Sequence, residues 1–125
     1  MNSEAKNSTD FLIAAGEIKG LVVFRNNCGA LPDGRGGMVR FGVANQHGGS
    51  DFIGWYYGRF CAFEIKADND KTNPERLAKQ EHFIAQVVNS GGFAGFVKRP
   101  IDVKNIIDGI GCRVLKHYPI SHLKQ

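Results

Sequence analysis

The sequence predicts an α/β fold in which a mixed central sheet is flanked by helices. Apolar runs of strand length recur along the chain, with amphipathic segments before, between and after them. One amphipathic segment of helix length separates the run at residues 60–63 from the run at residues 93–97. Because such a crossover joins parallel strands, we expect the order helix, two or three strands, helix, strand, helix.

The first third of the chain carries signals for one helix and for strands separated by a loop. Residues 8–10, Ser-Thr-Asp, can cap a helix over residues 11–15, although the polar residues before them could extend this helix upstream. Residues 21–24 are apolar and predict a strand. Residues 26–37 are rich in Gly, Asn, Pro and Asp and predict a loop, after which residues 38–41 return briefly to extended structure.

A hairpin is expected in the middle of the chain. Residues 52–57 form a second apolar run, and Gly58 with Arg59 can turn this run directly into the strand at residues 60–63. Near the end of the chain, a short helix is expected over residues 101–110.

The helix between the two parallel strands has recognisable ends and one unusual position. Pro74 fits the first helical turn, Glu75 suits the positive end of the helix, and two glycines follow Asn89 as a stop. Gln80 falls at helical spacing within the apolar stripe, so a polar amide should face the sheet. The stripe consists of Leu77, Ile84, Val87 and Val88.

Size and composition favour a single domain spanning residues 1–125, because 42% of the residues are apolar and 22% are charged. The chain has no run of eighteen apolar residues and no signal-peptide pattern, so we expect a cytoplasmic protein without a membrane partner. Three cysteines without CxxC spacing favour reduced thiols over a disulfide framework or a zinc site.

The charge distribution points weakly to an anionic partner. The formal net charge is +4, with six Lys or Arg against two acids in residues 97–125 and four against one in residues 19–47. Residues 48–96 are nearly balanced, with five against six. Two basic flanks around a more acidic centre suit a polyanion, although a solvated basic surface explains the same counts.

The segment Glu64-Ile65-Lys66 places two charged side chains at the end of an apolar strand, which is costly unless they are paired or bind something. Because side chains alternate along a strand, Glu64 and Lys66 should share one face at roughly 7 Å, while Phe63 and Ile65 point the other way. One face is therefore expected to carry chemistry and the other to pack.

Asp51 opens the preceding apolar run, so hairpin pairing should bring it near Glu64 and Lys66. Two adjacent carboxylates repel each other, and a hard divalent cation such as Mg²⁺ relieves that repulsion with oxygen ligands. Lys66 would then hold or activate a water. The alternative is a buried ion pair of Lys66 with Glu64 or Asp51, with Gln80 capping a backbone group.

Three segments together resemble the pattern of the VRR-NUC domain, a compact branch of the PD-(D/E)XK nuclease superfamily that also occurs as stand-alone phage and bacterial proteins. They are Gly49-Ser50-Asp51, Glu64-Ile65-Lys66 and Gln80, and residues 26–29, Asn-Asn-Cys-Gly, are also similar. The similarity runs from about residue 21 to residue 107. It implies a restriction-endonuclease-like αβββαβα core.

The resemblance also implies roles for individual residues. In this family the acidic side chains, here Asp51 and Glu64, and the main-chain carbonyl of Ile65 bind Mg²⁺ or Mn²⁺. Lys66 serves the attacking water, and Gln80 supports the site. Ser50 stands where many members have Pro, which mainly affects the turn. Many members also have a Glu in the first helix, for which the candidates are Glu4, Asp10 and Glu17, with Ser8 nearest the expected place.

The activity that the resemblance implies is metal-dependent hydrolysis of phosphodiester bonds in branched DNA. Stand-alone members resemble homodimeric resolvases of Holliday (four-way) junctions, in a bacterial host or a phage-infected cell, with no organic cofactor. Flap or splayed-arm cleavage is the enzymatic alternative. A catalytically idle nucleic-acid-binding module of the same fold is the alternative from another class.

Several basic side chains outside this pattern are candidate contacts for phosphate groups. They are Arg35 and Arg40 in the glycine-rich loop, and Lys98, Arg99, Lys104, Arg113 and Lys116 near the end of the chain. The four histidines lack metal-ligand spacing, and His47 is of interest because it precedes Asp51 in a glycine loop.

Overall fold

The structure is a computed structural model that describes residues 1–109. No helix in this part of the chain is long and apolar enough to cross a membrane. In chain order, the helices and strands are α1 (Glu4–Gly16), β1 (Leu21–Arg25), β2 (Gly29–Pro32), β3 (Met38–Phe41), β4 (Phe52–Tyr56), β5 (Arg59–Ile65), α2 (Pro74–Asn89), β6 (Phe93–Val97) and α3 (Pro100–Ile107).

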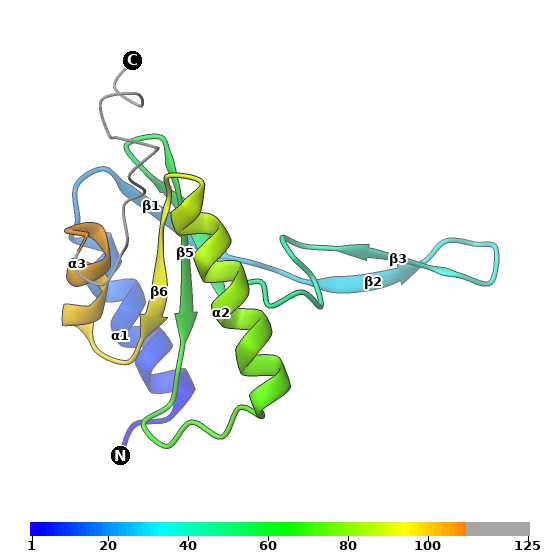
Figure 1. Ribbon diagram of the computed structural model, residues 1–125, viewed down its shortest axis with the longest axis horizontal. Helices are drawn as coiled ribbons and strands as arrows, with labels where there is room; N and C mark the ends of the chain where they lie inside the picture. Colours follow the sequence, from blue (N-terminus) through cyan, green and yellow to red (C-terminus); the bar gives the residue numbers. More distant parts are fainter. Residues whose placement is uncertain (110–125) are drawn as a thin grey trace.

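Four strands form the main sheet in the order β1-β4-β5-β6 (Figure 1). The pairs β1–β4 and β4–β5 are antiparallel, whereas β5 and β6 are parallel and are joined by the crossover helix α2. The predicted mixed sheet flanked by helices is thereby confirmed.

The helices cover the two faces of the sheet unequally. Helix α1 packs on β1 and β5 and α3 packs on β6, whereas α2 packs on β5 and β6 from the opposite face (Figure 1). The core includes Phe11 of α1, whose ring lies 4.9 Å from that of Phe52 and 5.0 Å from that of Phe63. Each such buried ring stabilises the fold by about 1.5–3 kcal/mol.

Helix α1 starts further upstream than residues 8–10, as the alternative in the sequence allowed. Ser3 is the N-cap, and its side chain accepts a hydrogen bond from the Lys6 amide. The expected cap residues lie inside the helix, where they find other partners. Thr9 Oγ1 donates to the Ala5 carbonyl at 3.2 Å, and Asp10 pairs with Lys6 at 2.7 Å.

The loop predicted over residues 26–37 is only partly correct, because β2 pairs with β3 in an antiparallel hairpin. This hairpin forms an arm that projects from the body of the molecule (Figure 1). At its tip, the Asp33 carboxylate accepts hydrogen bonds from the Arg35 and Gly37 amides. The sequence of β2 resembles a loop because glycine and proline are both unusual in strands. The strand forms nevertheless, because its pairing partner lies just beyond the turn.

The turn between β4 and β5 lies one residue earlier than predicted, at Tyr57 and Gly58, which both have positive φ (47° and 82°). That backbone geometry is typical of two-residue hairpins. The register pairs Phe52 with Phe63, which sets Asp51 beside Glu64, whereas the predicted turn at Gly58 and Arg59 would have set Asp51 beside Lys66. The last helix begins at Pro100 and ends at Ile107, and the predicted final residue 110 lies outside the described residues.

Candidate functional site

The acidic pair forms where β4 begins and β5 ends. Pairing of Phe52 with Phe63 brings Asp51 beside Glu64. Asp51 Oδ2 accepts a hydrogen bond from the Ile65 amide at 2.8 Å, and the carboxyl groups of Asp51 and Glu64 are also hydrogen-bonded to each other. The hairpin thus brings these predicted site residues together.

Glu64 is 5% exposed. Burial, together with the hydrogen bond and the negative charge of Asp51, raises the pKa of Glu64 to about 9. Lys66 opposes this pKa shift through its positive charge. Glu64 therefore holds a proton at neutral pH when no cation is bound.

Lys66 lies just beyond β5 with its ammonium group buried. Its Nζ donates to Gln80 Oε1 at 2.6 Å and to Thr72 Oγ1 at 2.8 Å, and lies 3.6 Å from Asp70. Among the described residues Asp70 is its only ion-pair partner, so the alternative of a direct pair with either site acid is wrong. Gln80 accepts from this ammonium, and within residues 1–109 its side chain caps no backbone group.

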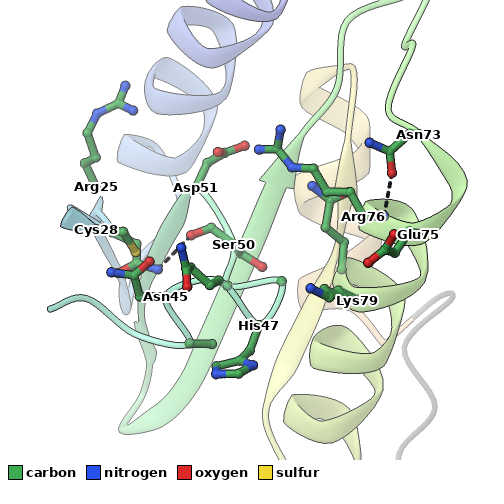
Figure 2. A pocket seen from close by; sticks show the side chains of 16 residues that line it. Arg25, Cys28, Asn45, His47, Ser50, Asp51, Asn73, Glu75, Arg76 and Lys79 are labelled. Atoms are coloured by element: carbon green, nitrogen blue, oxygen red, sulfur yellow. Dashed lines mark hydrogen bonds between the residues drawn. The ribbon is translucent and has the colours of Figure 1, made fainter. Parts of the chain in front are cut away.

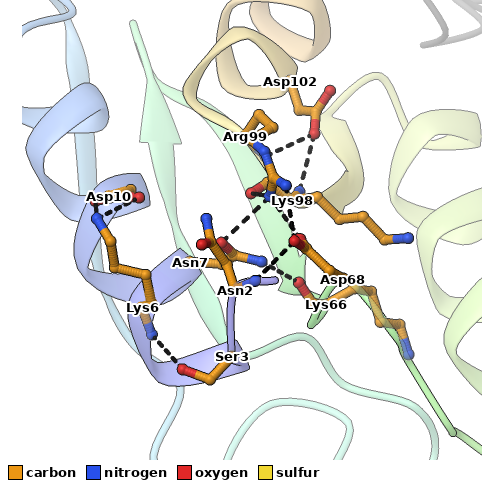
Figure 3. Close-up of polar contacts among 10 residues, drawn as sticks. All are labelled: Asn2, Ser3, Lys6, Asn7, Asp10, Lys66, Asp68, Lys98, Arg99 and Asp102. Carbon is orange, nitrogen blue, oxygen red and sulfur yellow. Dashed lines mark hydrogen bonds and ion pairs between the residues drawn. The ribbon is translucent and has the colours of Figure 1, made fainter.

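The backbone of Lys66 is fixed from the other side by a polar network (Figure 3). Asn7 of α1 is 1% exposed and donates its side-chain N–H to the Lys66 carbonyl at 2.7 Å. Arg99 forms two hydrogen bonds to Asp68, at 2.7 and 2.9 Å, and a longer one to Asn7 at 3.4 Å. Asp68 also accepts from the Asn2 amide, so the segment after β5 is held against the start of α1.

The first helix contributes an amide to this region. Asn7 was not predicted, and it contacts the Lys66 backbone directly. The acids considered from the sequence were Glu4, Asp10 and Glu17, with Ser8 nearest the expected place. The charge of Glu4 makes the smallest contribution to the raised pKa of Glu64. Asp10 forms an ion pair with Lys6, and Glu17 caps the far end of the helix.

A cavity of about 780 Å³ opens beside the acidic pair. Asp51 and the loop over residues 44–50 form one wall, and α2 forms the other (Figure 2). Figure 2 shows Asp51 and Arg76 extending toward each other from these two walls. Basic side chains from two elements, β1 and α2, line the cavity, which suits an anionic ligand. They are Arg25, Arg76 and Lys79.

Arg76 and Lys79 were missed in the sequence, although their spacing of three places them on one face of a helix. Ser50, also in the cavity lining, is 1% exposed, and within residues 1–109 its hydroxyl has no hydrogen-bond partner. A buried hydroxyl next to Asp51 is therefore available to a bound water or ligand.

The basic residues predicted near the end of the chain lie differently. Arg99 is engaged by Asp68, and Lys104 forms an ion pair with Asp108 at 2.7 Å. Lys98 is exposed. Arg35 and Arg40 lie on the projecting arm, whereas Arg113 and Lys116 lie outside the described residues.

No family model matches the chain, and no curated protein or solved structure matches it either. Within residues 1–109, no three His, Cys, Asp or Glu side chains gather as a possible metal site. Any cation here would thus depend on two carboxyl groups, a carbonyl and water.

Proposed function

We propose that this protein is a metal-dependent nuclease that hydrolyses phosphodiester bonds in branched DNA. The observation that carries the proposal is the pairing of Asp51 and Glu64 beside the buried ammonium of Lys66, at the edge of a cation-lined cavity. With the arm set aside, the element order αβββαβα agrees with the restriction-endonuclease-like core that the resemblance to VRR-NUC nucleases implies.

The donor set suits Mg²⁺ or Mn²⁺. Asp51, Glu64 and the Ile65 carbonyl would offer oxygen ligands, and Mg²⁺ accepts a small protein ligand set because it retains several waters. Glu64 holds a proton beside Asp51, and a cation can replace that proton. Such a cation supplies Lewis-acid chemistry, which polarises the phosphoryl oxygen and lowers the pKa of bound water.

Lys66 would position the attacking water. Gln80 and Thr72 hold its ammonium group at 2.6 and 2.8 Å, which orients the third N–H toward the weaker contact with Asp70 at 3.6 Å. A water can replace that weaker contact and be oriented by the lysine. Gln80 thereby acts as a positioning residue for Lys66.

The cavity suggests how DNA would be held. Arg25, Arg76 and Lys79 line it, and each can contact a phosphate next to the one being cleaved. A chain of 125 residues has little surface for reading bases, so we propose selection by DNA shape. A four-way junction presents two symmetric strands, and a two-fold homodimer would offer one site to each.

The first test is cleavage of end-labelled four-way junction, flap and linear duplex DNA in Mg²⁺ and in Mn²⁺. Lys66→Ala and Asp51→Ala should abolish cleavage. Lys19→Ala and Glu17→Ala are matched controls, because both residues are exposed and precede β1 at the opposite end of the sheet. The controls should cleave like the wild type.

Symmetric nicking of the junction would support a resolvase, whereas preference for the flap would keep the chemistry and change the substrate. Binding of DNA without cleavage in either metal would overturn the nuclease proposal and favour a binding module. Equal cleavage by wild type and Lys66→Ala would overturn the role of the lysine.

A further inference from the structure

The projecting arm has one apolar face that nothing in the described chain covers. The register pairs Gly29 with Phe41 and Leu31 with Val39, so the side chains of Leu31, Val39 and Phe41 share one face. Their exposed fractions are 61%, 56% and 43%. We call these three residues the arm face. A two-stranded hairpin in water is marginally stable, so a covering surface would stabilise it.

A second apolar surface lies on the main sheet, where α2 covers only β5 and β6. Val22 and Phe60 both pair with Trp55, and Phe24 lies two residues after Val22, so the four side chains point to one face. Their exposed fractions are 42% for Val22, 47% for Phe24, 47% for Trp55 and 40% for Phe60. We call these four residues the open sheet face.

The two surfaces do not meet within one chain. The arm leaves the body directly after β1 and extends away from the sheet (Figure 1). Its base is also fixed in direction. The Asn26 side chain bonds the Val43 amide and carbonyl and the Ser50 carbonyl, and Asn45 Nδ2 donates to the carbonyls of Gly29 and Phe41.

We propose that the arm face of each copy packs on the open sheet face of a second copy, so that two chains form a closed two-fold dimer. Reciprocal contacts of this kind cover the arm face and the open sheet face of both copies. None of these four surfaces is then left exposed to bind a third copy. Arg40 lies on the opposite face of the arm, because it pairs with Ala30, and remains accessible beside the partner.

The area is sufficient for such an interface. The seven side chains are each about half exposed, so each offers on the order of 100 Å² or less, because even an aromatic side chain buries roughly 150–250 Å² at most. Each copy then contributes up to roughly 700 Å² before any flanking polar surface is counted, and a standard interface buries about 800 Å² per partner. A fixed arm also loses little entropy on binding.

This inference names the surfaces of the homodimer in the proposed function, and the biological role of the dimer rests on that function. The contact itself does not depend on metal or DNA. Its test is therefore the molecular mass in solution without either, by light scattering over a range of concentrations. The wild type should have about twice the chain mass of 13.7 kDa.

Substitutions on each surface should give monomers. Val39→Glu changes the arm face, and Phe24→Glu changes the open sheet face. Met38→Glu is the matched control for the arm, because Met38 is 57% exposed on the opposite face of the same hairpin. Circular dichroism and thermal melts check that all three variants fold. We expect both surface variants to be monomeric and the control to remain dimeric.

Mixing the two monomeric variants separates this arrangement from others. Val39→Glu retains an intact open sheet face and Phe24→Glu retains an intact arm, so the mixture should form a heterodimer through one contact that dissociates more readily than the wild type. A monomeric wild type, a dimeric Phe24→Glu variant or a mixture that stays monomeric would each overturn the proposal. Loss of cleavage in a protein that still dimerises would count only against the nuclease.

Discussion

Burial and the neighbouring Asp51 carboxylate raise the pKa of Glu64 to about 9 from an ordinary 4.5. Below pH 4.5 this side chain is protonated in both the folded and the unfolded chain, so it causes no loss of stability. Above that pH the unfolded chain ionises while the folded chain stays protonated. The free energy of unfolding therefore falls progressively between pH 4.5 and pH 9.

Replacement of Glu64 by Gln should remove this loss. Without metal at pH 7.5, we expect Glu64→Gln to raise the free energy of unfolding by up to about 4 kcal/mol, because about three pH units above 4.5 each contribute about 1.4 kcal/mol. Urea denaturation at pH 7.5 and pH 4.5 measures the effect, which should shrink at the lower pH. Glu81→Gln, at an exposed position of α2, serves as the control. An equal gain at both pH values would contradict the explanation.

Metal binding should stabilise the wild type more than variants that lack a site carboxylate. A cation that binds only the folded chain stabilises it by about 2.7 kcal/mol at one hundred times its dissociation constant. We expect Mn²⁺ to raise the melting temperature of the wild type, and to have little effect on Glu64→Gln or Asp51→Asn. Differential scanning fluorimetry measures the shift. An undiminished shift in Asp51→Asn would place the cation elsewhere.

The amide of Asn7 is expected to stabilise the segment that carries Lys66. Asn7→Ala leaves the Lys66 carbonyl without its 2.7 Å hydrogen bond, in a buried position. The expected cost is about 1–3 kcal/mol. Chemical denaturation of this variant measures that cost, with the exposed Thr9→Ala on the same helix for comparison. A loss no larger than that of Thr9→Ala would argue against the network.

Strand alternation and a hairpin were sufficient to predict that Asp51 and Glu64 come together, because both are local properties of adjacent segments. Helical spacing likewise predicted the buried Gln80. The contact of Asn7 with Lys66 was beyond such reasoning, because 59 positions separate the two residues in sequence. Their meeting depends on how α1 packs against the sheet.

Among the elements, the arm shows the limits of composition. Glycine and proline within β2 are typical of loops, and the strand is formed because Met38–Phe41 pairs with it across the turn. In contrast, β4 and β5 were predicted directly from apolar runs, since both contribute to the core. Helix α1 was predicted but its start was not, because several residues upstream could serve as caps.

The close packing of β1 against β4 depends on Gly54. A Cβ atom at this position would collide with the Val22 carbonyl, whereas Gly16 at the end of α1 has open space around it. We expect Gly54→Ala to lower the free energy of unfolding by about 1–3 kcal/mol through overpacking. Gly16→Ala should be neutral or mildly stabilising. Thermal unfolding of both variants tests this, and equal melting temperatures would show that the sheet adjusts without cost.

At the scale of the whole molecule, the position of charge matters more than its total. The formal charge of +4 is modest, yet Arg25, Arg76 and Lys79 meet around one cavity from distant parts of the chain. Such convergence is not visible in a count of charges along the sequence, because it results from the placement of α2 opposite the end of β1. The basic residues predicted at Arg99 and Lys104 are instead held by acids.

If the cavity binds the phosphate groups of DNA, its cations should determine how binding depends on salt. Each phosphate contact releases counterions, so replacing Arg76 and Lys79 together by Ala should reduce the slope of log K against log salt by about 2. Affinity should fall similarly for different sequences, because these contacts read the backbone. Fluorescence anisotropy with a labelled junction in Ca²⁺, at several KCl concentrations, measures the slope. Lys19→Ala should leave it unchanged, and an unchanged slope in the double variant would place the DNA on another surface, with the arm as the first alternative.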